Sequence, residues 1–197
     1  MHFLDPKFLI EGAGLVGVIM IIFAESGLFF GFFLPGDSLL FTAGLLASQN
    51  LLNPYILYFG CLVAAIAGDS VGYAFGKKVG PKLFSKEESW FFNKKHIERS
   101  QAFFAKHGKK AIILARFTPI VRTFTPILAG VGSMEYKTFL TYNIVGGFLW
   151  VTSMVVGGFW FGKLIPNPDK YILPIVAIIV ILSILPSIIS IWRNRKS

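Results

Sequence analysis

An apolar stretch near the middle of the chain carries two arginines and two prolines, and this combination limits how the chain can fold. The stretch covers 111–130, with Arg116 and Arg122 inside it and Pro119 and Pro126 interrupting it. A guanidinium at membrane depth costs at least about 3 kcal/mol, so it usually faces a polar cavity. Proline removes a backbone hydrogen bond and clashes with the preceding turn. We therefore predict a broken segment whose arginines line a polar site.

The composition places this stretch in a membrane protein. The 197 residues are 54% hydrophobic and only 15% charged, which is too apolar for an ordinary soluble domain. Several windows of about 20 residues contain few charges, and this is the length that a helix needs to cross a bilayer. We predict an all-α polytopic membrane protein that forms a single membrane domain over 1–197.

Six apolar stretches define the expected helices. They cover 8–24, 26–48, 54–76, 111–131, 138–162 and 171–192. The second is interrupted by Pro35-Gly36, and the third opens with Pro54, which suits a helix start. The first contains Glu11 and lacks a clear cleavage site, so we expect it to remain in the mature chain rather than act as a signal peptide.

A strongly basic loop orients the chain. The net charge is +9, and residues 77–110 contain ten lysines and arginines against three glutamates. Positive loops lie on the cytoplasmic side and contact anionic lipid, so we expect this loop and the tail Arg193–Lys196 to be cytoplasmic. Within the loop, Lys94–His107 is amphipathic and is expected to lie on the membrane surface. This explanation of the charge makes a nucleic-acid partner unnecessary.

The number of membrane crossings then predicts a re-entrant hairpin. Two cytoplasmic segments must be separated by an even number of crossings, yet three apolar stretches lie between them. The stretch 111–131 is the best candidate to enter from the cytoplasm and return, because backbone breaks at that depth require protein or a wet cavity around them. By symmetry, 26–48 is expected to form a hairpin from the outer face, which places the N-terminus in the cytoplasm.

A weak internal repeat supports this symmetry. Residues 72–77 (GYAFGK) resemble 158–163 (GFWFGK) at an offset of 86, and the same offset pairs Ala43-Gly44 with Ala129-Gly130. The prediction is an inverted repeat with two facing re-entrant hairpins, as in many secondary transporters. Chance matching among glycine- and phenylalanine-rich segments is the alternative.

The two arginines are the candidate anion-binding residues. On an unbroken helix Arg116 and Arg122 would point about 240° apart, but a turn at Pro119 would let both guanidiniums converge. Two guanidinium groups, each with several N–H donors in one plane, suit a phosphate or a pair of carboxylates. The alternative is that each arginine extends separately toward the cytoplasmic headgroups.

Three acidic residues are candidates for partners of the arginines. Glu25 and Asp37 flank the first predicted hairpin, where they could take up and release protons or pair with the arginines in the empty site. For Asp37 the alternative is a cap of a helix starting at Ser38. Asp69, which follows Gly68 in the third stretch, is a second-rank candidate for which a structural ion pair is equally plausible.

Other chemistry is not expected. Cys61 is the single cysteine, so an internal disulfide is excluded, and the three histidines lie outside the apolar stretches. The sequence contains no P-loop, metal-ligand cluster or serine–histidine arrangement. We therefore expect neither a metal site nor a cofactor nor catalytic residues. The sequence does not fix the oligomeric state and is compatible with a homo-oligomer.

These motifs resemble the DedA family of bacterial inner-membrane proteins, which are also described as SNARE-associated or VTT-domain proteins. The resemblance covers roughly 12–165. The matching motifs are Glu25 with Pro35-Gly36-Asp37, the run 68–76 (GDSVGYAFG), and 115–122 (ARFTPIVR) with Ala129-Gly130, Gly132 and Met134. The Arg-x-x-Pro-x-x-Arg pattern after a basic amphipathic loop is the most specific of them.

The resemblance implies a function. It implies two facing re-entrant hairpins. It also implies a flippase that moves polyprenyl-phosphate lipid carriers, chiefly undecaprenyl phosphate, from the outer to the inner leaflet. It also implies that Glu25, Asp37, Arg116 and Arg122 are needed, with the proton as coupling ion in some members. The expected partners are thus a polyprenyl phosphate, membrane lipids and protons, and the expected location is the bacterial cytoplasmic membrane.

Two rival functions stay open at this point. A proton-coupled exporter of cations or small drugs would bind its substrate through the same carboxylates. A membrane lipid phosphatase is suggested by 35–38 (PGDS), which resembles a Pro-Gly-x-Ser motif, but the arginine expected soon after that serine is replaced by Leu39 and Leu40.

Overall fold

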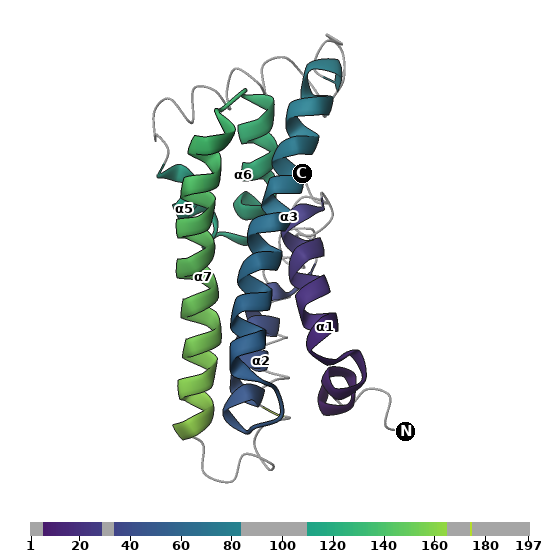
Figure 1. Cartoon of the computed structure of the whole chain (residues 1–197), viewed down its shortest axis with the longest axis vertical. Coiled ribbons are helices and arrows are strands. Elements are labelled where there is room, and N and C mark those ends of the chain that lie inside the picture. The colour runs from purple at the N-terminus through teal and green to yellow at the C-terminus, as the bar shows by residue number, and fades with distance from the viewer. Residues whose placement is uncertain (1–5, 29–33, 84–109, 165–173, 175–197) are drawn as a thin grey trace, which may run out of the picture. The chain divides into compact units, whose positions relative to one another are not determined.

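The chain forms α-helices throughout the part that the computed structural model describes, which is residues 6–28, 34–83, 110–164 and 174. The helices are α1 (Pro6–Gly27), α2 (Gly36–Ser48), α3 (Pro54–Leu83), α5 (Ala111–Ala115), α6 (Pro119–Val131) and α7 (Tyr136–Leu164) (Figure 1). No strand occurs within these ranges, so the predicted all-α class is confirmed for them.

Two of these helices are long and apolar enough to cross a membrane. They are the segments Pro54–Val79 of α3 and Tyr136–Leu164 of α7. The Asn53 side chain caps α3, because its Oδ1 accepts hydrogen bonds from the backbone N–H groups of Tyr55 (3.0 Å) and Ile56 (3.1 Å). Such a cap satisfies donors that the first helical turn would otherwise leave without partners.

The basic segment begins later than the sequence suggested. Helix α3 continues to Leu83, so Lys77, Lys78 and Lys82 are helical rather than part of a loop over 77–110. Lysine is a good helix former, and its long stem can follow an apolar surface while the ammonium reaches water. The amphipathic segment Lys94–His107 and almost all of the sixth apolar stretch, 171–192, lie outside the described residues.

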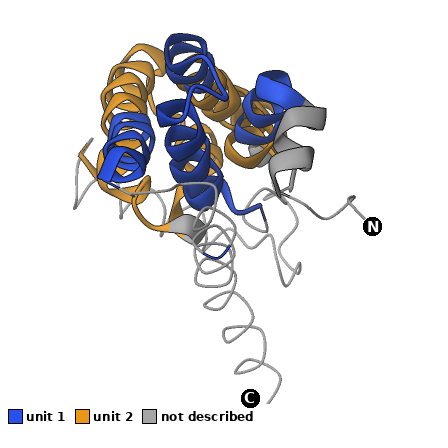
Figure 2. Ribbon diagram, turned by 90° about the horizontal axis from the view of Figure 1, so that it is seen from below, with its two compact units in different colours: residues 1–22, 33–61, 151–197 blue, residues 23–32, 62–150 orange. Residues whose placement is uncertain are grey.

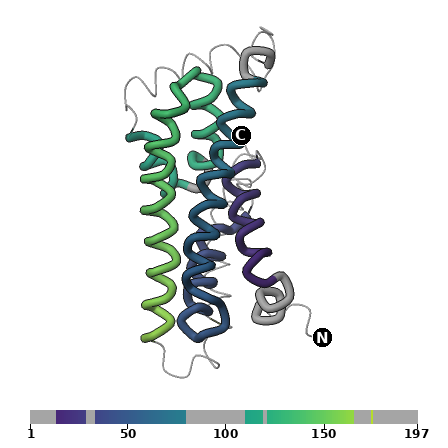
Figure 3. The backbone as a smooth tube through the Cα atoms, in the orientation of Figure 1, coloured from purple at the N-terminus to yellow at the C-terminus, as the bar shows by residue number. Residues whose placement is uncertain are grey.

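Both predicted interruptions are present, although one proline acts differently. Helix α1 ends at Gly27 and α2 begins at Gly36, and the stretch 111–131 is divided by a turn between α5 and α6, which the backbone trace shows (Figure 3). Pro119 occupies the first turn of α6, where its missing N–H costs nothing.

The prediction that Pro126 also breaks this stretch is wrong. Helix α6 continues through Pro126 to Val131. A proline inside a helix removes one hydrogen bond, here to the carbonyl of residue 122, and tertiary packing can offset that loss. Pro126 is buried, and its ring lies against α3, 3.5 Å from where a Cβ on Gly72 would stand.

The chain divides into two compact units (Figure 2). The first contains 1–22, 33–61 and 151–197, and the second contains 23–32 and 62–150. Helices α1, α3 and α7 each contribute residues to both, whereas α2 belongs to the first unit and α5 and α6 to the second.

Glycines bring α2 and α7 into close contact in the first unit. A Cβ added to Gly44 would lie 2.3 Å from the carbonyl oxygen of Val155, and one added to Gly158 would lie 2.0 Å from that of Phe41. Side chains larger than hydrogen would therefore force the backbones apart. The Gln49 amide also donates a hydrogen bond to the Gly162 carbonyl (3.0 Å).

The second unit contains a similar contact between α6 and α3. A Cβ on Gly130 would lie 2.1 Å from the Tyr73 carbonyl oxygen, and one on Gly76 would lie 2.1 Å from that of Ile127. The ring of Tyr73 stacks on Phe139 of α7 with centroids 4.7 Å apart, and its hydroxyl donates to the Met134 carbonyl. These contacts anchor α6 against both long helices.

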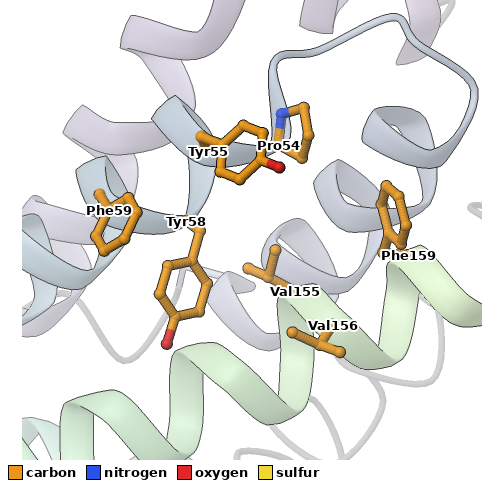
Figure 4. Close-up of a pocket in the computed structure, with 7 residues that line it drawn as sticks. All are labelled: Pro54, Tyr55, Tyr58, Phe59, Val155, Val156 and Phe159. Atoms are coloured by element: carbon orange, nitrogen blue, oxygen red, sulfur yellow. The ribbon is translucent and has the colours of Figure 1, made fainter.

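The first unit also carries an apolar groove of about 400 Å³ (Figure 4). Residues of α3 and α7 line it: Pro54, Tyr55, Tyr58, Phe59, Val155, Val156 and Phe159. The Tyr58 hydroxyl is hydrogen-bonded to Thr152 (2.7 Å). The lining contains no charged side chain, so the groove suits hydrocarbon and offers nothing to bind a charged headgroup.

Candidate functional site

The turn between α5 and α6 positions both candidate arginines in the second unit. Arg116 follows the last residue of α5, and Arg122 lies in the first turns of α6. Thr118, between them, has an extended backbone (φ −122°, ψ 109°), as the residue before a proline usually does. Both arginine side chains are only 2% exposed. Neither arginine therefore extends toward solvent at the surface of the protein.

Arg116 is held by oxygens from two long helices. Its Nη2 donates to Asp69 of α3 in a buried ion pair and to the Asn143 Oδ1 of α7 at 2.5 Å. The Ala65 carbonyl of α3 accepts a longer bond from the same nitrogen, at 3.4 Å. Charge-assisted bonds of this kind are the strong ones in protein interiors. Asp69 is therefore the direct partner of Arg116, a stronger role than its second rank in the sequence suggested.

Arg122 pairs with Glu25. Its Nη2 donates to the Glu25 Oε1 at the end of α1, and the two side chains are 2% and 1% exposed. Helix α1 reaches this position because it crosses α3 closely: a Cβ on Gly68 would lie 2.7 Å from the Phe23 carbonyl oxygen. The expectation that an acidic residue of the first broken segment pairs with an arginine of the second is confirmed for Glu25.

Both guanidiniums converge on one aromatic ring. The Cζ of Arg122 lies 4.4 Å from the centroid of Trp150, and that of Arg116 lies 5.9 Å from it. Both distances are within the range of a cation–π interaction. The predicted convergence of the two arginines around the Pro119 turn is thus observed, with the indole of α7 beside both.

The four charged side chains of this cluster carry no net formal charge. Two arginines and two carboxylates (Glu25, Asp69) give a formal charge of 2 − 2 = 0, and all four are buried. Within the described residues, no group of three His, Cys, Asp or Glu side chains lies together as a metal site would require. The arrangement is therefore a set of ion pairs in a low-dielectric interior.

Arg116 retains unused hydrogen-bond donors. In the described part of the chain its Nε and Nη1 have no hydrogen-bond partner although both are buried, and the same holds for Oδ1 of Asp69 and Oγ of Ser26. Such groups are rare in folded proteins, because an unsatisfied buried donor costs about 1–3 kcal/mol. Donors of this kind, on a guanidinium, are what an oxyanion would engage.

Asp37 lies in the first unit. It occupies the first turn of α2 and is half-buried. The helix starts at Gly36 rather than Ser38, so the alternative of Asp37 as the residue capping a helix at Ser38 is wrong. An acidic side chain here is favoured by the helix dipole. The buried Ser38 hydroxyl donates a hydrogen bond to the Pro35 carbonyl (2.9 Å). In the phosphatase alternative this hydroxyl would be the nucleophile, and here it is engaged in that hydrogen bond.

Two site residues on α7 escaped the sequence analysis. Asn143 and Trp150 lie seven residues apart, with Gly146 and Gly147 between them, and this i, i+3, i+4, i+7 spacing puts all four on one helical face. The pattern NxxGGxxW marks one face of the helix, but it does not by itself indicate what that face contacts. Both glycines face Arg116 and leave room for its side chain.

Comparisons with known proteins identify a domain family and relatives that match most of the chain. The VTT domain model matches residues 34–160. Protein DedA of Escherichia coli (strain K12) is 47% identical over 182 residues, covering 91% of this chain and 83% of that protein. An uncharacterized membrane protein of Mycobacterium leprae (strain TN) is 42% identical over 197 residues, covering 100% and 88%.

A more distant relative carries a location in its name. Inner membrane protein YqjA of Escherichia coli (strain K12) is 29% identical over 187 residues, covering 90% of this chain and 84% of that protein. No solved structure matches. The domain match and the relatives over nearly the whole length agree with the resemblance found from the motifs, and the chain belongs to the DedA family of VTT-domain membrane proteins.

Proposed function

We propose that this membrane protein translocates a polyprenyl phosphate, such as undecaprenyl phosphate, by binding its phosphate at Arg116 and Arg122. The observation that carries the proposal is that Nε and Nη1 of the buried Arg116 have no hydrogen-bond partner in the described chain. A phosphate offers several acceptor oxygens, and one of them could accept a hydrogen bond from Nε or from Nη1, whose N–H bonds point in different directions.

The neutral charge of the cluster supports coupling to protons. Bringing a phosphate of charge −1 or −2 into a set whose formal charge is zero leaves an uncompensated buried charge, which is costly. Protonation of Glu25 or Asp69 would restore neutrality for a phosphate of charge −1, and protonation of both would do so for a charge of −2. Glu25 would then release Arg122 to the phosphate, so that proton uptake and headgroup binding occur together. Asp37, in the first unit, keeps its proposed gating role from the family resemblance.

The broken segments support the proposed topology. A stretch divided at 116–118 into a five-residue and a thirteen-residue helix suits a re-entrant hairpin better than a straight crossing. The sequence repeat is supported by the packing, since Gly44 and Gly130 make equivalent contacts 86 residues apart. Their partner glycines, Gly76 and Gly158, are 82 residues apart. This separation differs from the sequence offset of 86 by four residues, which is about one helical turn. The basic segment and the C-terminus would be cytoplasmic.

Reconstitution tests the proposal. Purified protein in liposomes should make inner-leaflet polyprenyl phosphate accessible to an external phosphatase, whereas protein-free liposomes should expose the outer-leaflet pool alone. Arg116→Ala and Arg122→Ala should abolish this gain. Lys137→Ala, which removes an exposed cation from α7, is the matched control and should retain it.

Three results would contradict the proposal. Unchanged translocation in both arginine variants would reject the phosphate-binding role. Transport of organic cations that survives arginine loss would instead favour the exporter alternative, in which the carboxylates bind substrate. Release of inorganic phosphate by the protein itself would indicate an enzyme.

A further inference from the structure

Asn143 is a buried polar residue of α7 that contacts Arg116. It is 0% exposed, although α7 is an apolar helix long enough to span a membrane. A buried amide is costly unless its hydrogen bonds are made. Both ends of this amide are used: Oδ1 accepts from Arg116 Nη2 at 2.5 Å, and Nδ2 donates to the Ile66 carbonyl of α3 at 3.1 Å.

The bond to Ile66 fixes the direction of the amide. The carbonyl of Ile66 also accepts a hydrogen bond from the Ser70 hydroxyl (2.8 Å), so it is a fixed acceptor on α3. Turning the amide over would place its NH₂ group against the guanidinium and its oxygen against a carbonyl, and both contacts would be repulsive. The oxygen of Asn143 must therefore face Arg116.

The aliphatic part of the Arg116 side chain packs against α7 as well. A Cβ on Gly146 would lie 3.0 Å from Arg116 Cδ, and one on Gly147 would lie 3.6 Å from its Cζ. The glycines thus allow the arginine to lie directly against α7, one turn from Asn143. With Asp69 on the other side, Nη2 is fully engaged, and Nε and Nη1 are the donors left over.

A neutral acceptor has a consequence that a carboxylate would not have. An amide oxygen orients the guanidinium without cancelling its charge, whereas aspartate at the same position would add a negative charge beside Asp69. The cluster would then have a formal charge of −1, with Glu25 on α1 and Arg122 on α6 as its other charged members. Such a cluster would repel an anionic headgroup.

We infer that Asn143 is a positioning residue for anion binding, which aims the unused donors of Arg116 at the headgroup and keeps the site able to accept negative charge. This inference rests on the proposed binding of a lipid phosphate. It makes the chemistry of position 143 a determinant of selectivity: the site takes a phosphate-bearing lipid while the amide is present and rejects it when the amide becomes a carboxylate.

Equilibrium binding to the purified full-length chain tests this inference. The probe is farnesyl phosphate, with farnesol as the uncharged reference, measured between pH 5.5 and 8 for the wild type, Asn143→Asp, Asn143→Leu and Thr141→Asp. Thr141 is exposed two residues away on α7, so Thr141→Asp adds the same charge outside the cluster. Thermal unfolding of each variant identifies any that fails to fold.

The expected results differ between the variants. Asn143→Asp should weaken farnesyl phosphate binding by about tenfold or more at pH 7.5, as loss of a charge-assisted contact does, and the deficit should shrink toward pH 5.5 as carboxylates are protonated. Asn143→Leu should weaken binding with a pH profile parallel to the wild type. Farnesol binding and the Thr141→Asp control should be unchanged.

Three outcomes overturn the inference and can be told apart. If the wild type prefers farnesyl phosphate over farnesol and Asn143→Asp binds it equally well at every pH, the role of Asn143 is refuted while the phosphate proposal stands. If the wild type shows no preference for the phosphate, the proposed function fails and the inference fails with it. If Asn143→Asp does not fold, Asn143→Leu decides, because wild-type affinity in that variant refutes the positioning role.

Discussion

Arg122 donates a buried hydrogen bond to Glu25, a carboxylate 97 residues earlier in the chain. The bond joins α6 to the end of α1 inside the second unit, where both side chains are almost completely inaccessible. An ion pair at such depth gains little net stability over an apolar pair, but removing one partner leaves a charge without compensation. The pair is therefore a place where stability and function can be separated by mutation.

Glu25→Leu alone should destabilise the protein by about 3–5 kcal/mol, because the Arg122 cation stays buried without its partner. The double variant Glu25→Leu/Arg122→Leu should recover most of that loss, since two apolar side chains can pack where the ions were. Chemical unfolding in detergent would measure both. Recovered stability together with lost phosphate binding would show that the pair is kept for function. Equal instability of the single and double variants would contradict this interpretation.

Glu25→Gln should bind a lipid phosphate more tightly than the wild type. The carboxylate and the phosphate compete for Arg122, so neutralising the carboxylate removes a competitor of similar chemistry. We expect a gain in affinity of about tenfold, the size of one charge-assisted hydrogen bond, with slower lipid translocation because release becomes harder. Affinity and flux should both be measured on one preparation. A fall in affinity would argue against competition at Arg122.

Trp150 should stabilise the protein through the face of its aromatic ring. Trp150→Leu removes the aromatic surface next to both guanidiniums and should cost about 1–2 kcal/mol of stability from the lost cation–π contacts. Trp150→Phe retains a ring and should retain part of this energy. Comparing the two by thermal unfolding separates the π interaction from simple loss of volume. Equal effects would assign Trp150 to packing alone.

Two adjacent glycines of α7 provide a matched test of the packing. A Cβ on Gly158 would lie 2.0 Å from the Phe41 carbonyl oxygen, whereas one on Gly157 would meet nothing closer than 3.8 Å. Gly158→Ala should destabilise the first unit by at least about 2 kcal/mol through overpacking.

The control substitution should not lower the stability of the protein. Gly157→Ala should be neutral or stabilise by up to about 1 kcal/mol, because alanine favours the helix over glycine. Yield of monodisperse protein and the midpoint of thermal unfolding would report both. A similar response from the two variants would be inconsistent with the close α2–α7 contact.

The sequence predicted the parts of the site that are marked by charge in an apolar setting. Arg116, Arg122 and Glu25 stand out because membrane depth penalises ions, and Pro119 predicted the turn that lets the arginines converge. Asp69 stood out for the same reason, but its partner could not be chosen, because several pairings of two cations with three carboxylates fit one sequence. Packing in three dimensions selects among them.

Other features depend on tertiary contacts that leave weak local signals. Pro126 is tolerated inside α6 because neighbouring helices hold that segment, and a propensity argument about an isolated helix cannot anticipate this. Asn143 and Trp150 carry no net charge, so nothing in composition separates them from ordinary helix residues. Their spacing around Gly146-Gly147 becomes meaningful once Arg116 is known to lie against that face.

The most direct measurement of the central claim is a structure of the protein with a bound polyprenyl phosphate. We predict that a phosphate oxygen lies within hydrogen-bond distance of Nε or Nη1 of Arg116 and that Glu25 has separated from Arg122, while Asn143 keeps its bonds to Arg116 and Ile66. A phosphate bound elsewhere, with both ion pairs intact and the Arg116 donors still without partners, would contradict the account.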